Sequence, residues 1–326
     1  MTAIHIQGLG TYVPTKRITN VDLMSLVDTN DEWIVSRTGI KARHMLADDE
    51  NGSDAGTEAA LKALEDAGIA AEDITHVLTA TCTPDYLCPS TACIISGKIG
   101  SHGAMAFDLN AACTGFVYGL DVANSILAGK PGAKVLLVGS EAFTRRLNWE
   151  DRTTCILFGD GAAAAVLTNG DAGTPKRCLP SAPRLRDVRC GADGRQYPLL
   201  TVGGGTNRNY NFYLQMQGRE VFKQAVRSLS AVCSELLEDN GLTLEDIDLF
   251  IPHQANLRII EAVGDRLKLG SEKIFVNLDE YGNTSAASIP LGIGDACAQG
   301  RIRPGSRVLL SAFGGGFTWG AALLEF

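Results

Sequence analysis

An internal repeat constrains the fold of this chain more than any other feature of its sequence. Residues 64–68 (Leu-Glu-Asp-Ala-Gly) recur as residues 237–241 (Leu-Glu-Asp-Asn-Gly), 173 positions later. Residues 72–74 (Glu-Asp-Ile) and 131–137 (a Pro-Gly-x-x-Val-Leu-Leu segment) recur at the same offset. Because this period exceeds the roughly 20–50 residues of a solenoid repeat, we expect two homologous half-domains that share one core.

The offset also relates two candidate functional segments. Residues 110–116 (Asn-Ala-Ala-Cys-Thr-Gly-Phe) contain Cys113, and the equivalent segment of the second half begins at Asn283. A cysteine and an asparagine therefore lie near equivalent turns of two equivalent halves. A pseudo-two-fold axis between the halves would bring the two residues together.

The composition is that of an ordinary globular protein, with 45% hydrophobic and 20% charged residues. The formal net charge of -8 argues against a general nucleic-acid surface, which would be basic. No apolar stretch reaches the roughly 18 residues that a membrane span needs, and the N-terminal residues lack the layout of a signal peptide. We therefore expect a cytoplasmic protein that binds neither nucleic acid nor membranes.

The cysteines favour the same compartment. There are nine, they are scattered, and none forms a Cys-x-x-Cys pair, which disfavours both a disulfide scaffold and a zinc site. A reducing cytoplasm fits this pattern, and most of the cysteines are expected to be small buried apolar residues.

Apolar runs alternate with helical patterns along the chain, which indicates an α/β protein with buried sheets. The predicted strands are residues 77–80, 106–109, 135–138, 249–251, 308–310 and 319–326, and the predicted helices are residues 57–67, 113–127 and 219–240, with another opening at Asn283. Residues 162–167 fit either a strand or a helix. Three insertions, residues 11–52, 144–154 and the irregular 184–213, are expected to carry binding residues, as loops on a rigid scaffold often do.

Cys113 is the candidate nucleophile. It follows a predicted strand and opens a predicted helix, and the N-terminus of a helix favours an anion. Since the thiolate is the reactive form of cysteine, we expect this position to lower the pKa of the Cys113 thiol. The alternative, which holds for any one of the nine cysteines, is a buried structural residue.

His253 and Asn283 are the candidate partners of the thiol. His253 can exchange a proton near neutral pH, although a histidine beside a proline is often structural, and Asn283 has the alternative role of a helix cap. Together with Cys113 they follow the carboxyl ends of predicted strands, where open α/β sheets bind ligands. The set suits thioester chemistry, because a thiolate can hold an acyl group while two hydrogen-bond donors stabilise an enolate.

Two glycine-rich segments are less specific. Residues 314–316 (Gly-Gly-Gly) allow a close backbone approach and could supply amides to an oxyanion, or they could form a flexible turn. Residues 158–161 (Phe-Gly-Asp-Gly) lack both the lysine of a P-loop and the spacing of a dinucleotide fingerprint. We expect no nucleotide hydrolysis, no NAD, no other cofactor and no metal.

These motifs, in this order, resemble the β-ketoacyl-acyl-carrier-protein synthase III family, the initiating condensing enzymes of type II fatty-acid synthesis. The resemblance runs from end to end. The segments that carry it are residues 31–34 (Asp-Glu-Trp-Ile), 37–40 (Arg-Thr-Gly-Ile), 111–116 (Ala-Ala-Cys-Thr-Gly-Phe), 158–162 (Phe-Gly-Asp-Gly-Ala), 253–256 (His-Gln-Ala-Asn), 281–285 (Tyr-Gly-Asn-Thr-Ser) and 313–320 (Phe-Gly-Gly-Gly-Phe-Thr-Trp-Gly).

The resemblance implies a thiolase fold, with two pseudo-symmetric halves in a five-layered α-β-α-β-α arrangement, and a homodimer. Residues 1–172 would form the half with the nucleophile and the CoA-binding loops, and residues 173–326 the half with His253 and Asn283. Cys113 would accept the acyl group of an acyl-CoA. His253 and Asn283 would assist decarboxylation of malonyl-acyl-carrier protein, whose carbanion would attack the acyl-cysteine.

The resemblance also assigns the remaining site residues. The backbone at Cys113 and Gly315 would form the oxyanion hole. The implied CoA-binding residues are Trp33, Arg37, Arg152 and Asn256, and the implied acyl-pocket residues are Cys88, Phe158 and Phe313. Without the resemblance, Trp33 reads as a loop anchor and the arginines as a solvated face.

An acidic carrier protein requires positive charge near the tunnel mouth. Arg258 and Arg266 are eight residues apart on a predicted helix, and Lys268 is close by, so the three are candidates for docking or for ordinary solubility. Arg258 matches a docking arginine of the family. Cys88 stands where many members of the family carry a bulky phenylalanine, so a longer or branched primer is a hypothesis beside the default, acetyl-CoA.

Several alternatives use related chemistry. A degradative thiolase would need a second cysteine near residues 313–316, where none occurs, and elongating synthases carry a second histidine where this chain has Asn283. Chalcone-synthase-like enzymes share the Cys/His/Asn set but are usually longer. An acyltransferase that esterifies secondary metabolites is the main alternative, and a non-catalytic acyl-binding or redox-sensing module is an alternative of another class.

Overall fold

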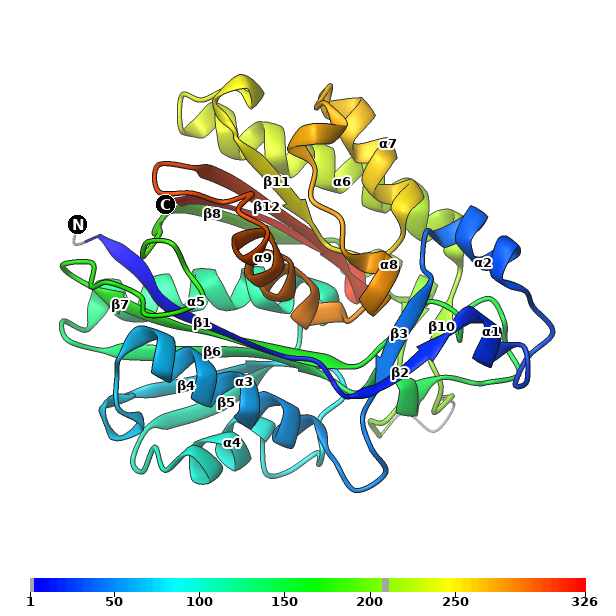
Figure 1. Ribbon diagram of the computed structural model, residues 1–326, viewed down its shortest axis with the longest axis horizontal. Helices are drawn as coiled ribbons and strands as arrows, with labels where there is room; N and C mark the ends of the chain where they lie inside the picture. The colour runs from blue at the N-terminus through cyan, green and yellow to red at the C-terminus, as the bar shows by residue number, and fades with distance from the viewer. Residues whose placement is uncertain (1–2, 207–210) are drawn as a thin grey trace.

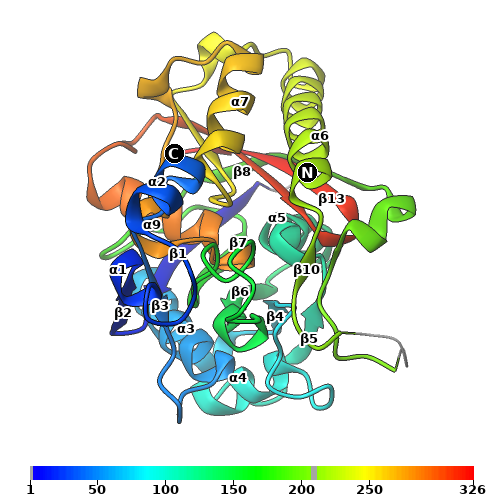
Figure 2. The same cartoon turned by 90° about the vertical axis from the view of Figure 1, so that its right-hand side faces the viewer.

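The structure is a computed structural model that describes residues 3–206 and 211–326. Five layers are visible in Figure 1, and Figure 2 shows the same order from the side. From one outer face to the other they are α3 (Gly52–Ala67) with α4 (Thr91–Ile99), a sheet, α5 (Gly115–Gly129) with α9 (Ser288–Ala298), a second sheet, and α6 (Gly218–Asp239) with α7 (Leu257–Leu267). The predicted α-β-α-β-α arrangement is confirmed.

The strands of the two sheet layers form one hydrogen-bonded set. Its order is β11-β12-β13-β8-β1-β7-β6-β4-β5, and the two layers are linked where His5 pairs with Arg184. The strand bounds are β1 (Ile4–Tyr12), β4 (His76–Ala80), β5 (Met105–Leu109), β6 (Lys134–Glu141), β7 (Gly161–Asn169), β8 (Arg184–Ala192), β11 (Leu249–Pro252), β12 (Arg307–Gly314) and β13 (Thr318–Glu325).

The sequence repeat is reproduced in the backbone. In one half β4 is parallel to β6, which is antiparallel to β7, and in the other β11 is parallel to β12, which is antiparallel to β13. Each half also has a 3-10 turn that leads directly into its central helix, η2 (Ala112–Thr114) before α5 and η7 (Ser285–Ala287) before α9. The first residues of these two turns agree in backbone conformation, because Ala112 has a φ of 48° and the equivalent Ser285 a φ of 50°.

The two central helices are apolar because they lie between the sheets. Phe116 and Leu120 of α5 and Ile289 and Ile293 of α9 belong to one buried cluster with residues of both sheets. Burying a side chain of this kind stabilises the folded state by about 1.5–3 kcal/mol. The outer helix α3 ends at Gly68, which has the left-handed φ of 65° that favours glycine, as the sequence predicts.

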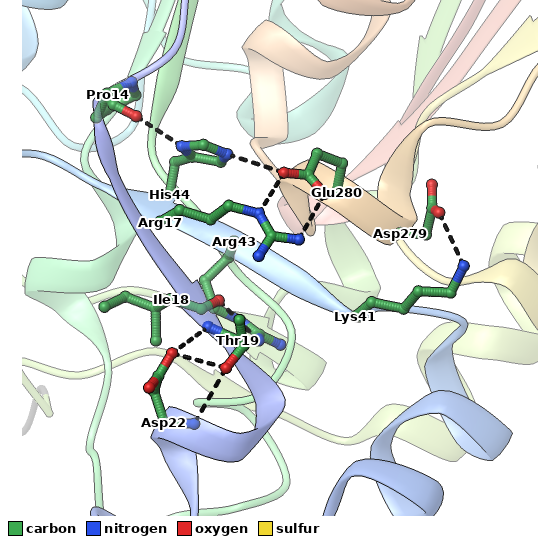
Figure 3. A network of polar contacts seen from close by, with 10 residues as sticks. All are labelled: Pro14, Arg17, Ile18, Thr19, Asp22, Lys41, Arg43, His44, Asp279 and Glu280. Carbon is green, nitrogen blue, oxygen red and sulfur yellow. Dashed lines mark hydrogen bonds and ion pairs between the residues drawn. The ribbon is translucent and has the colours of Figure 1, made fainter.

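The insertion at residues 11–52 is an ordered arm. Its elements are β2 (Lys16–Thr19), α1 (Asn20–Leu23), α2 (Asp31–Thr38) and β3 (Ala42–Met45). Figure 3 shows how the arm binds α8 (Leu278–Tyr281): Arg17 and His44 both reach Glu280, and Lys41 reaches Asp279. The backbone N–H of Lys41 also donates to the carbonyl of Asp279 at 2.8 Å. Exposed ion pairs contribute little stability, so the arm chiefly fixes the chain just before Asn283.

Two predictions about local structure are wrong. Residues 184–192, predicted to be irregular, form β8, a strand whose arginines hide its apolar residues from pattern analysis. Asn283 does not open a helix, because η7 intervenes and α9 begins at Ser288. Residues 162–167 lie in strand β7, and residues 207–210 of the predicted loop lie outside the described residues. In the part of the chain that the structure describes, we find no helix with the length and apolar character needed to cross a membrane.

Candidate active site

A cavity of about 500 Å³ brings the three candidate residues together. Cys113 reaches it from the turn after β5, His253 from the end of β11, and Asn283 from the segment after α8. Phe158 and Phe313 contribute to its walls. The carboxyl ends of strands from both halves therefore meet at one cavity, as the repeat led us to expect.

Cys113 lies in a tight turn that only a glycine neighbour permits. A side chain at Gly314, the last residue of β12, would place its Cβ 2.8 Å from the backbone nitrogen of Cys113. The thiol is buried, and this burial raises its pKa to about 12, more than hydrogen bonds from Ser285 and from its own backbone offset. The expectation that the helix N-terminus lowers the pKa of Cys113 is therefore wrong, because this position is also buried and lies beside the carboxyl group of Glu141.

His253 is fixed through one ring nitrogen. Its Nδ1 lies 2.6 Å from the hydroxyl of Ser288, and its backbone N–H donates to the carbonyl of Ser311 at 2.7 Å. Burial lowers the pKa of His253 to about 3, so the ring is neutral at physiological pH. When Ser288 donates to Nδ1, the ring proton resides on Nε2, which makes that nitrogen a hydrogen-bond donor.

This environment gives a test of the protonation state. We expect the imidazole NMR signals of His253, assigned with a His253→Asn variant, to stay constant between about pH 5 and pH 8, where an ordinary histidine titrates. The reason is a folded-state pKa below that interval, since burial penalises the charged ring. A titration midpoint above about pH 5 in the unliganded protein would contradict this account.

Asn283 presents its amide nitrogen as a donor. Its side-chain oxygen already accepts the backbone N–H of Ser285 at 2.8 Å. Its backbone is held on both sides, because its N–H donates to the carbonyl of Leu157 at 2.8 Å and its carbonyl accepts the N–H of Gly159 at 3.1 Å. Since the oxygen is occupied, the amide N–H₂ group is left for a ligand in the cavity.

A second cavity of about 420 Å³ also borders Cys113. Gly315, Cys82 and Leu214 line it, and Phe158 and Phe143, whose rings stack with centroids 4.8 Å apart, form part of its wall. Phe158 thus borders both cavities, whereas Phe313 borders the first. The predicted acyl-pocket residue Cys88 is exposed and lines neither cavity within this chain.

The predicted CoA-binding residues gather at the mouth of the first cavity. The guanidinium carbons of Arg37 and Arg152 each lie 4.9 Å from the ring centroid of Trp33. Asn256 caps α7 and donates from its side chain to the carbonyl of Arg37 at 3.1 Å. Trp33, Arg37 and Asn256 line the cavity, and Arg152 reaches it through Trp33. The arginine–indole stack presents a flat, cationic surface of the kind that binds a nucleotide base.

The three candidate docking residues are not equivalent. Arg258 is exposed at the start of α7 and lines the cavity mouth. Arg266 lies near the other end of α7, roughly 12 Å away at the rise of an α-helix, and Lys268 caps the helix in a left-handed conformation. Both are exposed but border neither cavity.

Sequence reasoning missed three polar residues at this site. Ser288 orients His253, Ser285 orients Asn283, and Glu141 is buried beside Cys113. Glu141 could have been found, because it lies three residues after the apolar strand run 135–138 and a charged residue there is unusual. The serines could not, since serines are common and the sequence does not mark the contacts they make: Ser288 meets His253 from 35 residues away, and Ser285 acts on Asn283 through its backbone N–H.

A cysteine, a neutral histidine and an asparagine at the meeting point of two thiolase-like halves define a thiolase-fold condensing enzyme. Two family models match the chain: 3-oxoacyl-[acyl-carrier-protein (ACP)] synthase III at residues 107–182, and the C-terminal part of the same synthase at residues 237–326. Curated relatives match at high identity over nearly the whole chain. The chain therefore belongs to the β-ketoacyl-[acyl-carrier-protein] synthase III family, whose members are acyltransferases.

The relatives include proteins and solved structures from several bacteria. A β-ketoacyl-[acyl-carrier-protein] synthase III of Nitratidesulfovibrio vulgaris is 58% identical, with 99% of this chain and 98% of that protein covered. One from Oleidesulfovibrio alaskensis is 52% identical, with 99% of each covered. The crystal structure of 3-oxoacyl-[acyl-carrier-protein] synthase III from Aquifex aeolicus is 42% identical, with a TM-score of 0.91 and coverage of 99% of this chain and 100% of that one.

Proposed function

We propose that the protein condenses an acyl-CoA primer, by default acetyl-CoA, with malonyl-acyl-carrier protein. The products are a 3-oxoacyl-acyl-carrier protein, CO2 and CoA, and the reaction initiates fatty-acid synthesis. The observation that carries this proposal is that Cys113, His253 and Asn283 line one cavity, while a second cavity also borders Cys113. Membership of the family supports the same reaction.

The geometry suits a two-step reaction. The sulfur of Cys113 attacks the acyl carbonyl, the backbone N–H groups of Cys113 and Gly315 hold the oxyanion, and CoA leaves as a thiol. The malonyl group then loses CO2, and the N–H groups of His253 and Asn283 hold the enolate oxygen. The enolate carbon attacks the acyl-Cys113 carbonyl, which forms the new carbon–carbon bond and breaks the carbon–sulfur bond, and the released Cys113 thiolate takes up a proton from solvent. No step requires a cofactor or a metal.

The two cavities have different roles in this proposal. The first, with Trp33, Arg37, Arg152 and Asn256 at its mouth, receives the CoA or carrier-protein arm. The second receives the acyl chain, because it borders Cys113, includes none of those four mouth residues and has apolar side chains in its wall. Its size admits a primer longer than acetyl.

Primer length offers a test of this assignment. Replacing Cys82 with phenylalanine places a ring in the second cavity, so we expect acylation by hexanoyl-CoA to fall at least tenfold, a modest value for steric exclusion from an apolar pocket. Acylation by acetyl-CoA should change much less, and Cys82→Ser is the control that keeps the cavity open. Equal losses with both primers would show that this cavity does not hold the acyl chain.

Partners follow from the surface. We propose that an acidic carrier protein docks at Arg258, with Arg266 and Lys268 as more distant contacts.

We also propose a homodimer across the open edge of β5, where Met105 is 57% exposed and Leu87 is 81% exposed. Such a dimer would bring Cys88, on the same loop as Leu87, toward the partner chain, which reconciles its exposure with an acyl-pocket role.

We further propose a cytoplasmic location, because the nine cysteines are all free thiols, and no binding of nucleic acid or membranes. We also propose that the chain divides into two thiolase-like halves, residues 1–172 and residues 173–326.

A priming β-ketosynthase from the R1128 polyketide biosynthetic pathway is 32% identical, with a TM-score of 0.89, so a priming role in polyketide synthesis is the second candidate.

The deciding experiment is a reconstituted reaction. The protein is incubated with acetyl-CoA and malonyl-acyl-carrier protein, and both CO2 and the mass of the carrier protein are followed. The proposal predicts one CO2 for each 3-oxoacyl-carrier protein formed. An acyltransferase that esterifies an alcohol would use the primer without malonyl-dependent CO2, and that result would replace the proposed function.

A further inference from the structure

Glu141, the last residue of β6, is a fully buried carboxyl group beside Cys113. It accepts hydrogen bonds from the hydroxyls of Thr83 at 2.6 Å and Ser285 at 3.0 Å, and from the backbone N–H of Cys82 at 3.2 Å. The Cys82 thiol and the Thr81 hydroxyl lie at 3.3 Å. Within residues 3–206 and 211–326, no lysine, arginine or histidine forms an ion pair with it.

The shell around this carboxyl group consists of donors. The Thr83 hydroxyl oxygen accepts the N–H of Ala142 at 2.8 Å, and the Thr81 hydroxyl oxygen accepts the N–H of Thr83 at 3.1 Å. Their hydroxyl hydrogens are therefore directed at Glu141. A buried site built from donors alone stabilises a carboxylate and leaves a carboxylic acid with one O–H group in need of an acceptor.

Ser285 connects this carboxylate to the nucleophile. Its hydroxyl donates to Oε1 of Glu141 at 3.0 Å, and the same hydroxyl lies beside the Cys113 side chain, where its interaction favours the thiolate. A hydroxyl has one hydrogen, and in the resting state that hydrogen is donated to the carboxylate. With that hydrogen on the carboxylate, the Ser285 oxygen is left to accept from the thiol, and a chain from S–H through O–H to the carboxylate would result.

We propose that Ser285 and Glu141 form a proton relay that accepts the thiol proton of Cys113 during acylation. This inference rests on the proposed function. As the sulfur–carbon bond to the acyl group forms, the S–H proton passes to Ser285 and the Ser285 proton passes to Glu141. As the bond between the acyl carbon and the CoA sulfur breaks, the same path returns a proton to that sulfur, so CoA leaves as a thiol and Glu141 is again a carboxylate.

The other groups in the site do not accept this proton. Burial lowers the pKa of His253 to about 3, and its Nδ1 is engaged by Ser288, while the amide of Asn283 is not basic. Burial also raises the pKa of Glu141, which brings its basicity closer to that of a thiol. The titratable groups that face Glu141 from the elements around it are the thiols of Cys82 and Cys113.

The test is Ser285→Ala. Alanine fits the backbone there, because the equivalent residue of the other half is Ala112 with nearly the same φ. The N–H of residue 285 still donates to Asn283, so the enolate site is preserved. We expect single-turnover acylation by acetyl-CoA, followed by rapid quench and intact mass, to fall about 10²-fold, the contribution of a general base. Decarboxylation of malonyl-acyl-carrier protein without a primer should change by less than about threefold.

The pH dependence of acylation distinguishes a proton relay from a purely structural role of Ser285 and Glu141. While Glu141 is ionised, the acylation rate of the wild type should vary little with pH, because Glu141 accepts the thiol proton through Ser285. In Ser285→Ala and in Glu141→Gln the thiolate must form by loss of a proton to solvent, so the rate should rise about tenfold for each pH unit below the thiol pKa. Asp66→Asn is the matched control, because Asp66 is a buried carboxyl group held by backbone N–H groups away from both cavities.

Two results would overturn the relay. One is Ser285→Ala acylating at the wild-type rate with the wild-type pH profile. The other is an equal fall of acylation and decarboxylation, which would mean that Ser285 only positions Asn283. Failure of the wild type itself to take up an acyl group would instead refute the proposed function, so the two failures are distinguishable.

Discussion

Cys113→Ala is expected to abolish condensation while malonyl decarboxylation continues. In the proposed reaction the sulfur of Cys113 forms the covalent bond to the acyl group, so its loss should reduce condensation by on the order of 10⁴-fold or more. In the proposed reaction the donors that hold the enolate belong to His253 and Asn283, whose contacts with Ser288 and Ser285 do not involve the thiol. The measurement follows 3-oxoacyl-carrier protein and CO2 in the same reaction.

Cys233→Ala provides the control for this prediction. Cys233 is equally buried in α6 but lines neither cavity, so its replacement tests the cost of removing a buried thiol. Its condensation rate should stay close to that of the wild type. If Cys113→Ala retained condensation, another group would carry the acyl chain and the assignment of the nucleophile would be wrong.

Asn283→Ala is expected to reduce malonyl decarboxylation by about 10²–10³-fold, the usual cost of removing one donor from an oxyanion site. The amide nitrogen is the donor because Ser285 already occupies the side-chain oxygen. Acylation of Cys113 by acetyl-CoA should persist, since the first oxyanion is held by backbone N–H groups. Asn283→Ala should therefore impair decarboxylation and spare acylation, whereas Ser285→Ala should impair acylation and spare decarboxylation.

His253→Ala should act in the same way, because Nε2 of the neutral ring is the second donor. We expect no rescue of its decarboxylation at low pH, since the wild-type ring is already neutral with a pKa of about 3. Loss of acylation together with decarboxylation in Asn283→Ala would contradict the division of labour between the two oxyanion sites. Intact mass after exposure to acetyl-CoA measures the first step, and CO2 release measures the second.

The repeat predicts a large part of the fold. It relates β6 to β12 and η2 to η7, because homologous halves keep the same order of strand, turn and helix. It also places Cys113 and Asn283 in equivalent segments, although Asn283 follows the short helix α8 and not the strand that the sequence predicts. The shared cavity follows from these two facts and from the position of His253 after β11.

The features that the sequence does not predict depend on contacts across the fold. Strand β8 contains Arg186, whose charge disguises the strand, yet Arg186 pairs with Glu325 at 2.7 Å on the neighbouring strand. The raised pKa of Cys113 depends on burial, which the helix N-terminus alone does not reveal. The exposure of Cys88 depends on the direction of its loop, and a motif match does not contain that direction.

In the proposed reaction Cys113 accepts the acyl group from acyl-CoA and then transfers it to the enolate formed from malonyl-acyl-carrier protein. The most direct measurement is intact-mass spectrometry of the protein after exposure to acetyl-CoA and then to malonyl-acyl-carrier protein, with Cys113→Ala in parallel. The account predicts an increase of one acetyl group, located on Cys113 and absent from the variant, that disappears when the carrier protein is added and 3-oxobutanoyl-carrier protein forms. An acetyl group on another residue, or one that malonyl-acyl-carrier protein does not discharge, would contradict it.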